Sequence, residues 1–147
     1  MSCAEVEVRP IHKNEYAPYI ELIDTFRPVG CALSSSFLLN SIEEIRRKGE
    51  ILVLVKGVTI VGALTLLMEQ KLIYNCCTYC HIEDVIVRKE FRGKGYGKIL
   101  LKEALEYAKK SGCLKCVLNC AESKKQFYSN FGFDDRDQSC LSVWFGN

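Results

Sequence analysis

The sequence has little proline, histidine or tryptophan: its 147 residues include three prolines, two histidines and one tryptophan. All three prolines lie in the first 28 residues, so no proline-rich linker divides the chain. A strong charge surplus is also missing, because 20 Lys and Arg residues stand against 18 Asp and Glu residues. This balance argues against a nucleic-acid partner or an anionic membrane. With those partners disfavoured, a small-molecule partner is expected. The length and the 48% hydrophobic content predict a single domain over residues 1–147.

Two targeting features are absent as well. The segment 1–7 has neither the basic region nor the apolar region of a secretory signal, which predicts a cytoplasmic protein. The longest apolar stretch, 51–68, is interrupted by Lys56, Gly57 and Gly62 and is rich in β-branched residues. It therefore predicts two buried strands joined by a turn, and no membrane span is expected.

Cysteine, in contrast, is abundant, and nine cysteines cannot all pair within one chain. In a reducing compartment we expect them to be thiols. Two C-x-x-C pairs leave a zinc site or a redox dithiol open as an alternative. Core packing explains them better, because Cys116 and Cys120 alternate with Leu118 along an apparent strand, and no metal is predicted. The nine are Cys3, Cys31, Cys76, Cys77, Cys80, Cys113, Cys116, Cys120 and Cys140.

Hydrophobic periodicity predicts a mixed α and β protein with a strand–loop–helix unit at its centre. Helices are expected over 15–26, 34–48, 97–110 and 123–131, where apolar residues recur at spacings of three and four. Strands are expected over 6–8, 51–55, 59–68, 81–87, 115–120 and 140–145.

Three alternating glycines precede the central helix, in the run Arg92-Gly93-Lys94-Gly95-Tyr96-Gly97. Glycines let the backbone approach a ligand closely, and the first amides of a helix have no partner within it. A phosphate placed there would gain these donors, the positive end of the helix dipole and the charges of Arg92, Lys94 and Lys98. We therefore predict a phosphate or pyrophosphate site, with a glycine-rich turn beside a solvated basic cluster as the alternative.

The loop fits neither of two common phosphate-binding patterns. A P-loop needs glycine where Arg92 stands and serine or threonine where Ile99 stands. The dinucleotide pattern G-x-G-x-x-G, counted from Gly93, has Lys98 at its last glycine. An NTPase and a Rossmann enzyme are therefore not supported.

The pattern R-x-x-G-x-G of this loop resembles the pyrophosphate loop of the GNAT family of N-acetyltransferases. Further segments are similar to the family members that acetylate glucosamine 6-phosphate, and the likeness is clear over about residues 69–133. These segments are E-Q-K-L-I at 69–73, H-I-E-D-V-I-V at 81–87, G-C at 112–113, L-N-C at 118–120 and F-Y-S-N-F-G-F at 127–133.

The resemblance implies an α/β (α+β) fold, in which a central twisted mixed β-sheet with splayed central strands is flanked by helices. It implies acetyl-CoA as co-substrate, with main-chain hydrogen bonds from the strand Val85, Ile86 and Val87 to the pantetheine arm. The remaining cofactor residues that it implies are Arg92, Gly93, Lys94, Gly95, Tyr96, Gly97, Lys98 and Tyr128.

The same resemblance implies direct attack of the acceptor amine on the thioester, with Tyr128 as the acid that protonates the CoA thiolate. A phenol with a pKa near 10 suits that role. Asp84 and Asn119 are the other implied catalytic residues, and Asn119 stands where the family has an acidic residue whose main-chain carbonyl orients the amine. The implied residues for glucosamine 6-phosphate are Arg27, Lys71, Leu72, Ile73, Tyr74, Glu83, Asp84, Val85, Leu114, Lys115 and Asn119.

Two features of the implied acceptor site raise questions that the sequence leaves open. Glu83 and Asp84 would point to opposite faces of a regular strand, so both reach one pocket only if the strand has a bulge. No basic residue follows Arg136, although the family carries a phosphate-binding arginine near its last strand. Either Arg27 or Lys115 compensates, or the acceptor carries less negative charge.

The resemblance also implies a homodimer whose subunits share active sites, with 71–74 reaching the sugar across the interface. The apolar stretch 141–145 is expected either in that contact or in the core of the chain. Two alternatives remain at this stage. One is an acetyltransferase for another amino sugar, a polyamine or a protein amine. The other is a CoA-binding or cysteine–metal module without activity.

Overall fold

The computed structural model describes residues 5–30, 32–136 and 138–146. Its contacts divide the chain into two compact units, Met1–Val117 and Leu118–Asn147. The strands of the described chain all lie in the first unit. The expectation of one domain over 1–147 stays a prediction.

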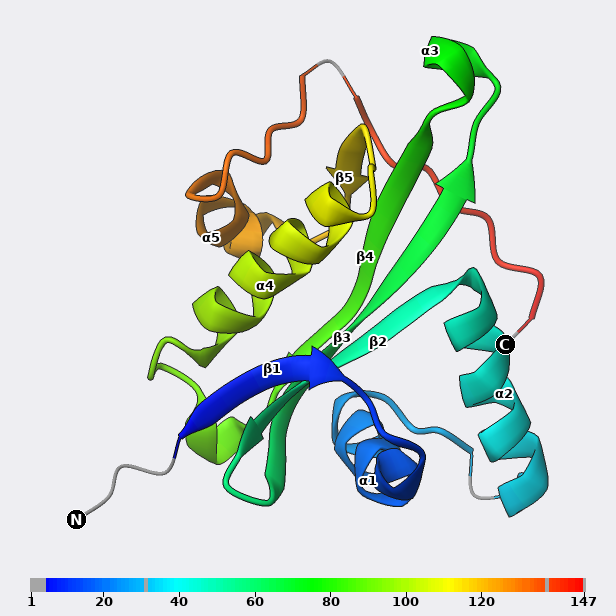
Figure 1. Ribbon diagram of the computed structural model, residues 1–147, viewed down its shortest axis with the longest axis vertical. Helices are drawn as coiled ribbons and strands as arrows, with labels where there is room; N and C mark the ends of the chain where they lie inside the picture. The colour runs from blue at the N-terminus through cyan, green and yellow to red at the C-terminus, as the bar shows by residue number, and fades with distance from the viewer. Residues whose placement is uncertain (1–4, 31, 137, 147) are drawn as a thin grey trace. The chain divides into compact units, whose positions relative to one another are not determined.

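The first unit contains a five-stranded sheet in the order β1-β2-β3-β4-β5 (Figure 1). The strands β1 to β4 pair antiparallel, and β5 pairs parallel with β4, so the predicted mixed sheet is confirmed. Its strands are β1 (Val6–Pro10), β2 (Gly49–Lys56), β3 (Thr59–Gln70), β4 (Thr78–Val87) and β5 (Lys115–Val117).

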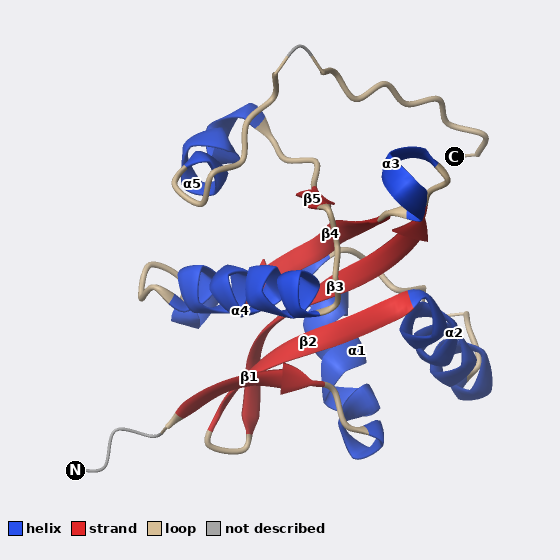
Figure 2. Cartoon of the chain, turned by 45° about the horizontal axis from the view of Figure 1, so that its top comes forward, coloured by secondary structure: helices blue, strands red, loops and turns tan. Residues whose placement is uncertain are grey.

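Helices cover both faces of this sheet (Figure 2). On one face α1 (Tyr16–Phe26) and α2 (Ser35–Lys48) pack onto β2 and β3, and a buried core joins Tyr19, Leu22 and Ile42 to Val53. The opposite face carries α4 (Tyr96–Lys110), whose apolar stripe is buried. These three helices begin and end within one or two residues of the predicted bounds, because their apolar spacing and flanking residues are regular.

Two cap residues explain where α2 begins and ends. The Ser34 hydroxyl accepts a hydrogen bond from the Phe37 amide at 3.3 Å, which satisfies one of the free donors of the first turn. Gly49 follows the last helical residue and opens β2 directly. A Cβ at Gly49 would lie 1.7 Å from the Leu66 carbonyl oxygen, so only glycine fits at this junction.

Three strand predictions need correction. β4 begins at Thr78 instead of near His81, because Thr78 and Tyr79 pair with the end of β3. β5 ends at Val117 instead of residue 120. The stretch predicted as a closing strand over 140–145 has no strand structure, and Leu141 and Phe145 are 91% and 94% exposed. Its alternating apolar residues suggested a strand, but no strand of the described chain pairs with it.

The second unit contains the short helical elements η3 (Glu122–Lys124) and α5 (Lys125–Ser129). They replace the longer helix predicted over 123–131. Other short elements belong to the first unit: η1 (Lys13–Glu15), α3 (Ile73–Cys76) and η2 (Lys89–Phe91). Among the described residues no helix is long and apolar enough to cross a membrane.

Candidate functional site

The glycine loop between η2 and α4 has the backbone conformation that only glycine adopts easily. Gly93 and Gly95 have φ values of +73° and +84°, in the left-handed region. A Cβ built on either residue would meet nothing within 4 Å. The left-handed backbone, and not a lack of space for a side chain, therefore favours glycine at these two positions. The loop has open space beside it for a ligand.

The amides of this loop are free to bind an anion. No backbone hydrogen bond is donated by Gly93, Lys94 or Gly95 within the described chain, and Gly95 caps α4 without a side-chain acceptor. The Ile99 amide makes the first hydrogen bond of α4, to the Gly95 carbonyl at 3.2 Å. Free amides therefore gather at the positive end of a 15-residue helix, which suits a phosphate or pyrophosphate.

Arg92 is anchored between this loop and β4. Its Nε donates a hydrogen bond to the Val87 carbonyl at 2.9 Å, and the residue is exposed. The anchor leaves the two terminal guanidinium nitrogens available beside the loop. Arg92 thus ties the predicted anion site to the end of the strand predicted to hold the pantetheine arm.

A further cation near the loop was missed by sequence analysis. Lys56, the last residue of β2, places its Nζ 5.9 Å from the ring centroids of both Phe91 and Tyr96. Lys94 lies 5.5 Å from the Phe91 centroid. Lys56 is far from the loop in sequence, and only the hairpin brings it there.

The pairing of β4 leaves part of one strand edge free. β4 pairs with β5 only over Tyr79–His81, whereas its pairing with β3 continues to Val87. In the described chain, Val85, Ile86 and Val87 therefore have a strand neighbour on one side only. This is the splayed arrangement expected from the resemblance, and it exposes main-chain groups next to the glycine loop.

A β-bulge separates Glu83 from Ile86. Thr65 pairs with Glu83 and Ala63 pairs with Ile86, so two residues of β4 lie opposite Leu64. Asp84 is in the bulge, with a φ of +51° that is unusual for a residue other than glycine. The bulge required for Glu83 and Asp84 to share one site is therefore present.

The two carboxylates differ in exposure, because Glu83 is partly buried and Asp84 is exposed. Burial raises the pKa of Glu83, and the charge of Asp84 raises it further. Burial also raises the pKa of Tyr19 in α1, and the charge of Asp84 adds to the rise. Thr65, the register partner of Glu83, is 3% exposed.

The predicted acceptor segment 71–74 forms the tip of the β3–β4 hairpin. Leu72, Ile73 and Tyr74 are 86%, 57% and 69% exposed. Tyr74 and the next two residues have φ values of 50°, 59° and 57°, a left-handed turn that costs about 1–2 kcal/mol per residue. The Gln70 side-chain amide stabilises this turn by donating to the Cys76 carbonyl at 2.7 Å.

Lys115 and Leu114 approach the hairpin from β5. The Leu114 amide donates to the Thr78 carbonyl at 2.8 Å, and Lys115 pairs with Tyr79. Lys71 and Lys115 are brought to the same ring, with ammonium groups 5.2 and 4.6 Å from the Tyr79 centroid. Tyr79 was not predicted as a site residue, because its place beside Lys115 depends on strand register.

Arg27 is at a different place from the two lysines. It follows the last residue of α1, and its guanidinium lies 5.3 Å from the Phe26 ring centroid. In the described chain Arg27 forms no ion pair. A contact between Arg27 and the phosphate of the acceptor remains a prediction.

Tyr128 and Asn119 belong to the second unit. Tyr128 lies in α5 within an aromatic cluster, 5.0 Å from the Phe127 centroid and 6.1 Å from the Phe133 centroid. Burial raises the pKa of Tyr128, and the charge of Cys120 adds to the rise, so the phenol is protonated at neutral pH. Asn119 is exposed. The catalytic roles of both residues stay predictions.

The cysteines of the two C-x-x-C pairs meet across the strands. Cys80 pairs in register with Cys116, and Met68 pairs with Cys80. The Cys113 Sγ lies 3.5 Å from the Met68 Sδ. Contact with Cys116 raises the pKa of the buried Cys80 thiol. The seven cysteines in the described chain are thiols, and Cys3 and Cys31 lie outside it.

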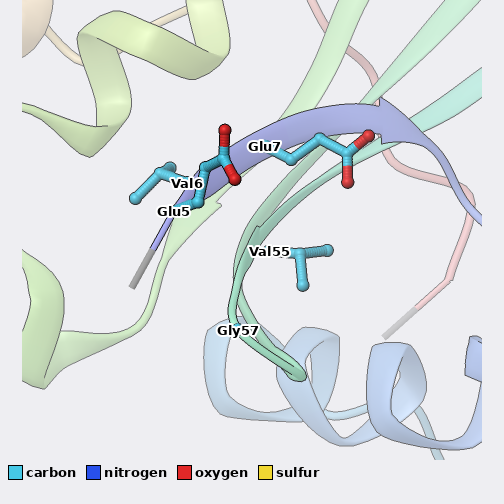
Figure 3. Close-up of a pocket in the computed structure, with 5 residues that line it drawn as sticks. All are labelled: Glu5, Val6, Glu7, Val55 and Gly57. Carbon is cyan, nitrogen blue, oxygen red and sulfur yellow. The ribbon is translucent and has the colours of Figure 1, made fainter. Parts of the chain in front are cut away.

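The described residues include no candidate metal cluster, and the surface pocket shown in Figure 3 lies apart from the glycine loop and the bulge of β4. Across 5–30, 32–136 and 138–146, no three His, Cys, Asp or Glu side chains are grouped to hold a metal ion. The pocket in Figure 3 is lined by Glu5, Val6, Glu7, Val55 and Gly57 at the start of β1. Its two carboxylates are unsuited to a phosphate ligand.

A sheet opened at β4, a glycine loop at the next helix and a bulge beside it define an N-acetyltransferase of the GNAT type. The model of the acetyltransferase (GNAT) family matches residues 15–133, and the chain belongs to this family.

Several similar proteins share one printed activity. The chain is 31% identical over 123 residues to a glucosamine 6-phosphate N-acetyltransferase of Arabidopsis thaliana, covering 80% of this chain and 82% of that protein. It is 30% identical over 133 residues to the Trypanosoma brucei brucei enzyme of the same name, covering 88% and 89%. A probable glucosamine 6-phosphate N-acetyltransferase of Drosophila melanogaster is 30% identical over 133 residues, covering 87% of this chain and 60% of the longer fly protein.

A solved structure of one of these relatives has the same fold. The crystal structure of the Arabidopsis thaliana enzyme superimposes with a TM-score of 0.85 at 27% identity, covering 97% of this chain and 99% of that chain.

Proposed function

We propose that this protein transfers the acetyl group of acetyl-CoA to the amine of glucosamine 6-phosphate, a step toward UDP-N-acetylglucosamine. The observation that carries the proposal is the juxtaposition on β4 of a cofactor edge, Val85–Val87, and an acidic bulge at Asp84. The activity printed for relatives about 30% identical over most of the chain supports the choice of acceptor.

The residues of the first unit suit acetyl-CoA. The free amides around Gly93 and Gly95 fit its pyrophosphate, with Arg92 and Lys94 beside them. The one-sided edge at Val85–Val87 offers main-chain groups to the amides of the pantetheine arm. Acetyl-CoA supplies the acetyl thioester, and the chemistry needs no metal.

The reaction proceeds by direct attack. The free amine of the acceptor adds to the thioester carbonyl, and the tetrahedral intermediate collapses with cleavage of the carbon–sulfur bond. Tyr128 gives its phenol proton to the departing thiolate, and the proton lost by the amine restores the phenol through solvent. The raised pKa of Tyr128 keeps the required proton on the phenol at neutral pH.

Other side chains orient the acceptor. Glu83 and Asp84 bind sugar hydroxyls and position the amine from the bulge. The main-chain carbonyl of Asn119 accepts a hydrogen bond from the amine, so asparagine suffices in place of an acidic residue. Lys71 and Lys115 provide positive charge for the phosphate.

We also propose that the protein is a cytoplasmic homodimer with shared active sites. The exposed hairpin tip, Leu72 to Tyr74, supports such an arrangement, because apolar side chains in a strained turn are typical of an interface or binding segment. The exposed side chains of Trp144 and Phe145 are further candidates for the contact.

A second acceptor class has one specific observation in its favour. No basic residue follows Arg136, where the resembled enzymes carry an arginine for the phosphate. A neutral amino sugar, a polyamine or a protein amine would not need that cation.

Release of the CoA thiol tests both acceptor classes. Acetyl-CoA is supplied with glucosamine 6-phosphate, glucosamine or a polyamine at matched concentrations. We expect strong turnover only with glucosamine 6-phosphate. Turnover that ignores the phosphate would overturn the proposed acceptor, and no turnover with any amine would favour a CoA-binding module.

The role of Tyr128 has its own test. Tyr128→Phe should lower kcat by about 100-fold while KM for acetyl-CoA stays within about twofold, because only the proton donor is removed. Phe133→Leu, in the same aromatic cluster, is the control for packing. Equal kcat losses in the two variants would contradict the acid role.

A further inference from the structure

The register of three strands places an acidic, an aromatic and a basic residue in one row. Glu69 of β3 pairs with Tyr79 of β4, and Tyr79 pairs with Lys115 of β5. Side chains of register partners lie on the same face of a sheet. Thr65 and Glu83 form a second register pair. Thr65 is an even number of residues from Glu69, and Glu83 is an even number from Tyr79, so Glu83 lies on the same face as the row. These five residues all lie in the first unit.

Two ammonium groups lie against the Tyr79 ring. The Lys115 Nζ is 4.6 Å from the ring centroid and the Lys71 Nζ is 5.2 Å from it. Both distances are within the range of an effective cation–π contact. Lysine side chains have many rotamers, so a shared ring restricts where both charges lie.

The cluster keeps a positive surplus. Glu69 forms an ion pair with Lys71 and also contacts the His81 Nε2 at 2.6 Å. Lys115 has no ion-pair partner in the described chain. One carboxylate therefore stands against two ammonium groups at the same ring, and the contact with Glu69 raises the pKa of Lys71, which keeps it charged.

We infer that Tyr79 is a positioning residue that holds Lys71 and Lys115 together as the binding site for the phosphate of the acceptor. The inference rests on the proposed function. A phosphate monoester carries up to two negative charges and accepts hydrogen bonds from several donors, so two ammonium groups on one ring suit it.

This arrangement accounts for the missing basic residue after Arg136. The pair is assembled from the hairpin and β5, and it needs no cation from the C-terminal segment. Lys115 has a counterpart among the resembled enzymes, whereas Tyr79 and the gathering of both lysines on its ring follow from register alone. Tyr79 selects for phosphate without touching it.

The test compares Tyr79→Leu with Tyr79→Phe. Phenylalanine keeps the ring and its negative face, whereas leucine keeps only bulk and hydrophobicity. KM and kcat are measured with glucosamine 6-phosphate and with glucosamine. For Tyr79→Leu we expect KM for glucosamine 6-phosphate to rise about fivefold, with kcat and the glucosamine kinetics within about twofold of the wild type. Tyr79→Phe should restore the wild-type KM.

A double-mutant cycle separates positioning from a general structural effect. In a Lys71→Gln/Lys115→Gln background, Tyr79→Leu should change KM for glucosamine 6-phosphate by less than about 1.5-fold, because the Tyr79 ring then has no ammonium groups to position. Tyr107→Leu on α4 is the matched control for loss of a tyrosine and should leave KM unchanged. An equal Tyr79→Leu effect in both backgrounds, or on both acceptors, would overturn the inference.

Failure of the inference and failure of the proposed function give different results. A wild-type protein that does not prefer glucosamine 6-phosphate over glucosamine contradicts the proposed acceptor, whatever Tyr79 does. A wild type that prefers it, together with a Tyr79→Leu variant of unchanged KM, contradicts only the role of Tyr79.

Discussion

The proposed sites at the two ends of β4 use different chemical groups, backbone at one end and side chains at the other. At its C-terminal end the proposed cofactor site uses backbone: the free amides of the loop around Gly93 and Gly95 and the one-sided edge Val85–Val87. At its N-terminal end the proposed acceptor site uses side chains, gathered by strand register around Tyr79.

This difference assigns different tasks to the two ends. Backbone groups bind any acyl-CoA in the same way, so the cofactor site suits a component shared by a whole family. Side chains on a sheet face can be exchanged one at a time without changing the fold, so the acceptor site is where specificity changes. Substitutions at one end of β4 should therefore change the kinetics for acetyl-CoA, and substitutions at the other end should change the kinetics for the acceptor.

The largest effect is expected at Gly95. Gly95→Val places a β-branched residue at a φ of +84° and adds a side chain beside free amides, and we expect kcat/KM for acetyl-CoA to fall about 100-fold. Gly57→Val is the matched control, because Gly57 has a φ of +63° and equally open surroundings. Thermal melting should show similar stability losses, whereas only Gly95→Val should lose affinity for acetyl-CoA. Similar kinetics in both variants would contradict a cofactor role for the loop.

The second effect concerns the bulge. Asp84→Gly relieves the left-handed backbone and Asp84→Asn tolerates it, but neither retains the carboxylate. We expect kcat/KM for the acceptor to fall about tenfold in both variants, with KM for acetyl-CoA unchanged and a melting temperature no lower than that of the wild type. Full activity in Asp84→Gly would show that the bulge alone matters.

A smaller effect is expected at Arg92. Arg92→Lys keeps the charge but loses the hydrogen bond from Nε to the Val87 carbonyl, so KM for acetyl-CoA should rise about threefold. Arg88→Lys loses a similar hydrogen bond, from Nε to the Ile60 carbonyl at 2.7 Å, outside the loop. A larger KM change in Arg88→Lys would contradict the anchoring role of Arg92.

The smallest effect is on stability, and it has opposite signs at two glutamates. Burial raises the pKa of Glu83, so its charge destabilises the fold at neutral pH, and Glu83→Gln should raise the melting temperature slightly at pH 7 but not at pH 4. The hydrogen bonds from Arg9 lower the pKa of Glu15 from 4.5 to about 2. The stability from Glu15 is therefore present above pH 4.5 and is lost as the pH falls toward 2.

Glu15→Gln should accordingly lower the melting temperature at pH 7 and have little effect near pH 2. Melting curves of both variants across this range check the signs. A destabilising Glu83→Gln at pH 7 would contradict a partly dry acceptor site.

The position and conformation of the glycine loop were predictable because its signal is contiguous. Gly93, Gly95 and the start of α4 follow one another, and both their spacing and the strand before them can be read from the sequence. The proposed acceptor site depends on strand register, which sets the neighbours of Tyr79. The adjacency of Glu83 and Asp84 shows that they need a bulge to share a pocket. The sequence does not predict that bulge, because nothing in 81–87 departs from the pattern of a regular strand.

The prediction of a strand over 140–145 failed for a related reason. Alternating apolar residues indicate a tendency to be extended, but a strand also needs a partner, and sequence analysis named none. Trp144 and Phe145 are exposed in the described structure, so neither contributes to the buried core.

The short pairing of β5 with β4 has a thermodynamic consequence. Where Val85–Val87 lack a second neighbour, a bound pantetheine arm would complete the hydrogen bonding of the sheet in the place of a strand. The ligand then becomes part of the secondary structure, and its binding energy adds to the free energy of unfolding. The melting temperature should therefore rise with CoA concentration, and the amides of this segment should exchange with deuterated solvent more slowly when CoA is bound.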